Sequence, residues 1–176
     1  MQPASRLSDE RGMTLVELMI AAFVLAVGVL AIFSVVTSSR ELTSKAETLE
    51  AASHLAQREL EAMQSLTWTA MAHPSVPASG PGTHTVTGTL YQHRAGQTET
   101  VAVDAAAGTV SAAPTAWSDG RLGGQIWRFV SWVNDPATAT ANDYKRLTVV
   151  VSVTTGRHAI QDPVVMSTFA ARKEGV

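Results

Sequence analysis

The 176-residue sequence contains no cysteine. Disulfide bonds and thiolate metal sites are therefore excluded, and the composition leaves the redox state of the compartment undecided. An excess of one charge sign is also missing, because 13 basic and 15 acidic residues give a net charge of −2. This balance argues against a nucleic-acid-binding surface. The length fits one globular domain beside an apolar segment.

Recognisable catalytic motifs are missing as well. The five histidines, at positions 54, 73, 84, 93 and 158, form no His-x-x-x-His pair beside carboxylates, so no metal site is predicted. There is no Gly-x-Ser-x-Gly motif and no phosphate-binding glycine loop, and neither Lys45 nor Lys173 follows a serine at the spacing Ser-x-x-Lys. We predict no catalytic residues, no cofactor and no enzymatic activity.

What the sequence does contain is one long apolar run. Leu18–Val36 is 19 residues without a charge, a proline or a side-chain amide, and 12 of them are Leu, Ile, Val or Phe. As a helix the run would be about 28 Å long, close to the roughly 30 Å hydrocarbon core of a bilayer. We therefore predict a single membrane-spanning helix, whose larger apolar side chains include Leu18, Ile20, Phe23, Leu25, Leu30 and Phe33.

A polar segment of 12 residues precedes this run and ends at Gly12. A secretory signal peptide would have a shorter apolar stretch followed by a small-x-small cleavage site, and no such site follows Val36. The favoured break is instead between Gly12 and Met13, which makes Glu17 the fifth residue of the remaining chain. The segment holds two basic and two acidic residues, so its removal leaves the net charge at −2.

Residues 12–17 and the apolar run after them resemble the type IV pilin superfamily. The resemblance is carried by Gly12, Met13, Thr14, Leu15, Val16 and Glu17. It implies that prepilin peptidase cuts after Gly12 and N-methylates Met13. It also implies a cytoplasmic leader and a head outside the cytoplasm. Two features depart from the family pattern: Met13 stands where mature pilins often have Phe, and the apolar run has no proline.

Glu17 is the sharpest candidate functional residue. A carboxylate inside the membrane edge is costly unless it is paired, and so it often marks a function. The resemblance implies an ion pair with the α-amine of Met13 on an adjacent subunit, which would set the register of assembly. Two structural alternatives remain: a capping box with Thr14 at the helix start, or a side chain that reaches the headgroups.

The helical pattern continues beyond the membrane segment, and we expect one helix from about Thr14 to Leu66. An apolar stripe is predicted on its second half, through Leu42, Ala46, Leu49, Ser53, Ala56, Leu60 and Met63. Packing of this stripe on a sheet is favoured over a coiled-coil seam, because the stripe is short and contains Ser and Ala.

The remainder of the chain favours strands after a proline-rich loop at 67–82. The expected strands are Thr83–Tyr91, Glu99–Asp104, Ile126–Val133, Arg146–Thr154 and Val164–Ala170. Residues 134–143 are expected to form an exposed loop, and 105–124 a loop with a short strand. Trp127 and Trp132 have opposite parity on one strand, so one is expected to face the core and the other to be exposed or covered by a loop.

These observations predict an α+β, pilin-like fold, with a long N-terminal helix and a C-terminal antiparallel sheet as head. The expected segments are a leader peptide (1–12), the membrane and assembly half of the helix (13–36), its amphipathic half (37–66) and a β-rich head (67–176).

In function the sequence looks most like a minor pilin of a bacterial type IV pilus, of the pilus-modification type, which is assembled into the fibre or primes it. The expected partners are prepilin peptidase, other minor pilins, the major pilin and the inner-membrane assembly platform. The expected location is the inner membrane, with a single span, and then the fibre. A minor pseudopilin of a type II secretion system is the nearest alternative. From another class, the head could be an adhesin at the fibre tip, which an exposed Trp117 or Trp132 beside a groove would support.

Overall fold

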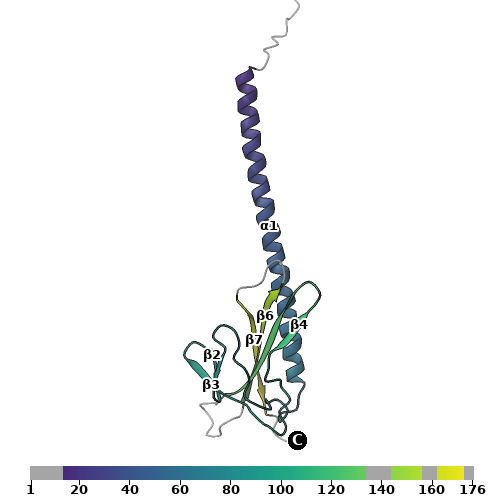
Figure 1. Ribbon diagram of the computed structural model, residues 1–176, viewed down its shortest axis with the longest axis vertical. Helices are drawn as coiled ribbons and strands as arrows, with labels where there is room; N and C mark the ends of the chain where they lie inside the picture. Colours follow the sequence, from purple (N-terminus) through teal and green to yellow (C-terminus); the bar gives the residue numbers. More distant parts are fainter. Residues whose placement is uncertain (1–13, 134–143, 156–161, 173–176) are drawn as a thin grey trace, which may run out of the picture. The chain divides into compact units, whose positions relative to one another are not determined.

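The computed structural model describes residues 14–133, 144–155 and 162–172 (Figure 1). These residues form one α-helix followed by a seven-stranded sheet in which the strand pairs are antiparallel. The predicted α+β architecture is confirmed. The chain has two compact units, divided between Thr43 and Ser44.

The helix, α1, runs without interruption over 50 residues, Leu15–Gln64. It begins and ends within two residues of the predicted helix. Its residues are mostly good helix formers, and it contains no proline that would remove a backbone hydrogen bond. Gly28 lies within it, and a Cβ atom added there would meet nothing within 4 Å.

The sheet has the strand order β1-β2-β3-β5-β6-β7, and β4 also pairs with β5. The two longest strands, β5 and β6, form its centre, and β7 is at one end of the order. Figure 1 shows β2 and β3 on the side of β6 and β7 away from α1. The strands are β1 (Thr85–Thr87), β2 (Leu90–Arg94), β3 (Gln97–Val101), β4 (Thr115–Ser118), β5 (Gly123–Val133), β6 (Tyr144–Thr155) and β7 (Val164–Ala171).

Two strand predictions were wrong in their extent. Thr83–Tyr91 is not one strand, because Gly88 has φ of 58° and turns the chain between β1 and β2, which then pair with each other. Glu99–Asp104 ends as a strand at Val101. Beyond it, Val103 makes only an isolated parallel bridge to His73.

The main core lies between the second half of α1 and one face of the sheet. Ala52, Ala56 and Met63 are buried against alternate residues of β5 and β6, including Val130 and Leu147. Both alanines are fully buried in this cluster. Their packing on the sheet fixes which face of the helix is buried.

The predicted apolar stripe on α1 is therefore correct only toward its C-terminal end. Ala56 and Met63 are buried as expected, but Leu42 and Leu49 are 67% and 44% exposed. In their place Thr48 is buried, one helical turn before Ala52. The buried positions follow the small residues that fit against the sheet, not the largest apolar ones.

An ion pair holds the same helix face to the sheet. The Glu59 carboxylate accepts hydrogen bonds from Nε and Nη2 of Arg128 on β5, at 3.0 and 2.7 Å. Nη1 of Arg128 donates to the Thr115 hydroxyl on β4, at 2.9 Å. Both charged side chains are largely buried, so removing either one would leave an unpaired charge at the helix–sheet contact.

The opposite face of the sheet has a second, smaller core. Tyr91 and Phe129 stack with ring centroids 4.4 Å apart, beside Val101 and Val150. Trp127 packs against this cluster and Trp132 against the main core. Trp127 is therefore half-buried against this second core rather than exposed.

His73 connects the loop after α1 to three other segments. Its ring is buried, with Nδ1 3.0 Å from the Val110 carbonyl oxygen, and Nε2 accepts a hydrogen bond from the Val130 N–H at 3.1 Å. Because Nε2 accepts, the proton of the neutral ring must be on Nδ1. Its backbone N–H donates to the Ala102 carbonyl at 2.9 Å. Burial lowers the pKa of His73 below 6.5, and burial likewise lowers the pKa of His84.

We predict that the head loses stability as the pH falls below about 6.5. There the unfolded chain takes up protons at His73 and His84 that the folded chain does not bind. The free energy of unfolding should fall by up to about 1.4 kcal/mol per pH unit for each histidine. Urea unfolding can be followed at pH 7.5, 6.0 and 5.0 by tryptophan fluorescence, since all four tryptophans lie after α1.

The variant His73→Gln should reduce this pH dependence, and His54→Gln, at an exposed position on α1, should leave it unchanged. Equal pH dependence in His73→Gln and the unmodified chain would contradict the assignment to His73.

Candidate functional site

The start of α1 is capped by Thr14. Its hydroxyl oxygen accepts a hydrogen bond from the backbone N–H of Glu17, at 3.3 Å. This is the geometry of a helix N-cap, in which a side chain satisfies one of the unpaired N–H groups of the first turn. A capping box consists of two reciprocal hydrogen bonds, and the structure thus contains the one that the Thr14 hydroxyl accepts.

The carboxylate of Glu17 has no such contact. Within residues 14–133, 144–155 and 162–172 it forms no hydrogen bond and no ion pair, and the side chain is exposed. It is the one charged side chain between Thr14 and Val36. Glu17 therefore combines a negative charge, an apolar surrounding surface and unused hydrogen-bonding capacity.

The apolar surface around it is also uncovered. The side chains that were predicted to face a membrane are 60–70% exposed: Leu18, Ile20, Phe23, Leu25, Leu30 and Phe33. Among the described residues, α1 is the one helix long and apolar enough to cross a membrane, judged by length and composition. An apolar surface this extensive needs lipid or other protein to cover it.

Two predicted site residues, Gly12 and Met13, lie outside the described residues. Their roles as the cleavage site and the new N-terminus remain predictions from the sequence.

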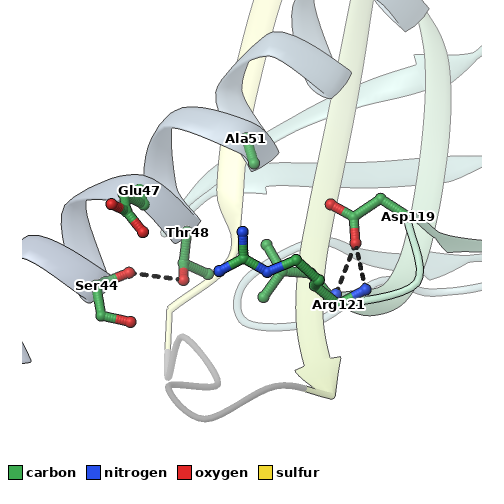
Figure 2. A pocket seen from close by; sticks show the side chains of 7 residues that line it. Ser44, Glu47, Thr48, Ala51, Asp119 and Arg121 are labelled. Atoms are coloured by element: carbon green, nitrogen blue, oxygen red, sulfur yellow. Dashed lines mark hydrogen bonds between the residues drawn. The ribbon is translucent and has the colours of Figure 1, made fainter.

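In the head, a groove lies along the first turns of α1 after Thr43. It has a volume of about 470 Å³. Figure 2 shows Glu47 and Ala51 on the helix and Asp119 and Arg121 on the loop between β4 and β5. The Asp119 carboxylate accepts the backbone N–H of Arg121 at 2.9 Å and of Leu122 at 2.7 Å, and these hydrogen bonds lower its pKa.

Sequence reasoning did not find this groove. The Asp119-Gly120 pair, a common turn signal, marks its loop, and Gly120 has φ of 87°. Which helix residues face the loop depends on tertiary packing. The described lining contains carboxylates, a guanidinium and hydroxyls but no imidazole, so it offers no hydroxyl–histidine pair for nucleophilic catalysis.

The four tryptophans do not form an exposed patch. All are half-buried. Trp117 packs on the main core, and its Nε1 donates to the Ser152 carbonyl at 3.2 Å. Trp68 and Trp132 lie edge to face with centroids 5.9 Å apart.

Lys145 lies between those two rings, with Nζ 4.6 Å from the centroid of each. Nζ also donates to the carbonyls of Trp68 and Met71, at 2.6 and 2.9 Å, and burial lowers the pKa of Lys145 to about 8. These contacts give Trp68 and Trp132 a structural role in anchoring the loop that follows α1.

Comparison with known proteins bears on the N-terminal region. Residues 7–33 match the family model described as the prokaryotic N-terminal methylation motif, the prepilin-type leader of type IV pilins. No curated protein and no solved structure matches the chain.

The chain thus carries the prepilin-type methylation motif at residues 7–33, and its long N-terminal helix with a C-terminal antiparallel sheet is consistent with a pilin-like architecture. The motif supports a type IV pilin- or pseudopilin-type protein. It implies processing by prepilin peptidase and assembly with other pilins. Proteins with this motif are structural rather than catalytic, and the motif and helix indicate membrane anchoring.

We predict that Thr14→Ala frays the start of α1. Loss of an N-cap hydroxyl costs about 1 kcal/mol, so amide exchange at Glu17 in detergent micelles should accelerate about fivefold. Hydrogen exchange measured by NMR provides the readout. Thr37→Ala is the matched control, because the Thr37 hydroxyl bonds only the Phe33 carbonyl within the helix. Unchanged exchange at Glu17 in Thr14→Ala would show that the cap contributes nothing.

Proposed function

We propose that this chain is a minor pilin subunit of a bacterial type IV pilus. In this proposal prepilin peptidase cuts after Gly12 and methylates the amine of Met13. The mature subunit waits in the inner membrane, held by residues 13–36, with residues 67–176 outside the cytoplasm. It then joins other pilins in the fibre, near the tip, through the assembly platform. The matched motif and the resemblance in residues 12–36 support the cleavage, the methylation, the membrane anchoring and the assembly with other pilins.

The observation that carries the proposal is that the Glu17 carboxylate forms no hydrogen bond or ion pair with the residues that the structure describes. In a bilayer or in a fibre core, the surroundings of Glu17 have a low dielectric constant, and a lone charge there is expensive. Cleavage after Gly12 would create a positive α-amine four residues before Glu17. An ion pair between this amine on one subunit and Glu17 on its neighbour would neutralise both charges.

Such an ion pair would determine how neighbouring subunits are positioned along each other more than how tightly they bind. The apolar side chains around α1 can pack in several registers with similar energy, because they cover the helix on all sides. A subunit shifted along its neighbour would leave both charges unpaired, and breaking a buried pair in this way costs about 3–5 kcal/mol. The correct register is thus favoured because every other register leaves both charges unpaired.

The Thr14 cap is compatible with this role. Thr14 accepts a hydrogen bond from the N–H of Glu17, whereas the reciprocal capping-box bond, from the Thr14 N–H to the Glu17 carboxylate, is not formed among the described residues. The carboxylate therefore stays available for a partner on another subunit.

A pseudopilin of a type II secretion system would use the same cleavage and the same helix. Our choice of the pilus rests on the likeness of the Thr-, Val- and Trp-rich β head to minor pilins, while the motif itself fits both machines. Recovery of the chain in sheared surface fibres would support this choice, and recovery only with secretion components would overturn it.

We predict that the mature chain begins at N-methylated Met13. Intact-mass and N-terminal analysis of the membrane-extracted protein, from cells with and without a prepilin peptidase, tests this. The expected result is loss of residues 1–12 and gain of one methyl group only when the peptidase is present. An intact leader in both samples would remove the basis for the proposal.

We further predict that Glu17→Gln is processed and inserted normally but enters fibres at least tenfold less efficiently. The amide keeps the size of the side chain and removes the charge, so the ion pair is lost. Sheared fibres and membranes are compared by quantitative immunoblot. Glu50→Gln removes an exposed carboxylate from the second half of α1 and serves as the matched control. Equal fibre incorporation of the two variants would contradict the assembly role of Glu17.

A further inference from the structure

A second cavity lies on the face of the sheet opposite α1 and is lined by polar side chains. Its volume is about 300 Å³. This is at the lower end of the roughly 300–1,000 Å³ typical of small-molecule sites. The described lining includes His84, His93, Arg94, Arg146, Thr148 and Ser167.

A β-bulge in β2 brings two of these side chains to the same place. Successive residues of a regular strand point to opposite faces, yet His93 and Arg94 both line the cavity. The pairing of β2 with β3 shifts register between Gln92 and Arg94, which places the bulge at His93. Bulges of this kind often redirect side chains at binding sites. On the other wall, Thr148 and Ser167 are direct partners across β6 and β7.

The fixed charges of the cavity leave one positive charge uncompensated. Nε of Arg146 donates to the Glu99 carboxylate, at 2.9 and 3.1 Å, and the Ser131 hydroxyl donates to the same carboxylate. Glu99 and Arg146 therefore neutralise each other. The side chain of Arg94 forms no hydrogen bond or ion pair with any residue that the structure describes.

Hydrogen-bonding capacity is also unused inside the cavity wall. The His93 side chain is only 10% exposed, and its Nδ1 has no hydrogen-bond partner among the described residues; a carboxylate oxygen of Glu99 is 3.9 Å away. Thr148 Oγ1 is buried in the same wall, where it interacts with the side chain of Tyr91. A buried polar group without a partner is costly, so Nδ1 of His93 needs a physical reason.

We propose that this cavity binds a small oxyanion, a carboxylate or a phosphate group. Arg94 supplies the positive charge, and His93 and Ser167 supply hydrogen bonds that nothing else in the described head uses, with the Thr148 hydroxyl beside them in the lining. Two sources share this chemistry: a phosphate group, and the carboxylate of an acidic sugar, for which the cavity is large enough. The site is independent of Glu17 and of fibre assembly.

The experiment is calorimetric titration of the full chain in uncharged detergent with sodium phosphate and, separately, with sodium glucuronate, at constant ionic strength. We expect saturable binding of at least one anion with a dissociation constant near 1 mM or below. Binding of phosphate alone or of glucuronate alone would support the site and identify the source. Absence of saturable binding for both would overturn it.

Arg94→Gln tests the assignment of the charge. This variant should fold, since the Arg94 side chain is exposed and has no hydrogen bond or ion pair to lose among the described residues, and its thermal unfolding should match that of the unmodified chain. We expect its affinity for the anion to fall at least tenfold. Arg121→Gln removes the same charge from an exposed position on the β4–β5 loop and should change affinity less than twofold. Equal losses in the two variants would show non-specific attraction and overturn the proposal.

Ser167→Ala provides a second, milder test. Ser167 is exposed on β7, and its hydroxyl has no partner among the described residues, so folding should be unaffected. A threefold or greater loss of affinity would support a direct hydrogen bond to the anion. Unchanged affinity in both Ser167→Ala and Arg94→Gln would place any binding elsewhere and overturn the proposal.

Discussion

The close contact between the second half of α1 and the central strands is the constraint on which the head depends. Ala52 and Ala56 allow the helix to lie near β5 and β6, and the ion pair of Glu59 with Arg128 fixes its position along β5. Arg128 in turn bonds Thr115, which places β4. The β4–β5 loop then forms the groove along the helix. One helix face therefore determines the core, the position of an edge strand and the shape of the adjoining surface.

The same helix meets two different environments without a break. Before Thr43 its apolar side chains are exposed on every side, as suits contact with lipid or with other helices. After Ser44 the exposed positions are largely polar and the buried ones small. Helix propensity is satisfied throughout, so a change in side-chain chemistry, not in backbone conformation, separates the two parts. This arrangement lets one element serve as membrane segment and as part of the head's core.

The sequence was sufficient to predict the features that depend on local chemistry. The motif around Glu17, the length of α1 and the central strands β5 and β6 were all evident from residue type and spacing. Features that depend on tertiary contact were not. The phase of the buried helix face was misjudged because the small Thr48 and Ala52, not Leu49, fit against the sheet. The turn at Gly88 was hidden within a run of strand-forming residues. The bulge at His93 leaves no mark in the sequence, because a bulge is defined by the partner strand.

β7 is the last strand in the order of the described sheet, and this leaves one edge of the sheet open to other molecules. Its eight residues, Val164–Ala171, carry no charge, and no described strand pairs with its outer side. Such an edge is a template for strand pairing between molecules. The charged residues nearest in sequence, Asp162 and Arg172, stand just outside the strand, where they can act as gatekeepers. Crowding of unassembled heads would therefore favour association through β7, so aggregation on overproduction would reflect an open edge and not a poorly folded core.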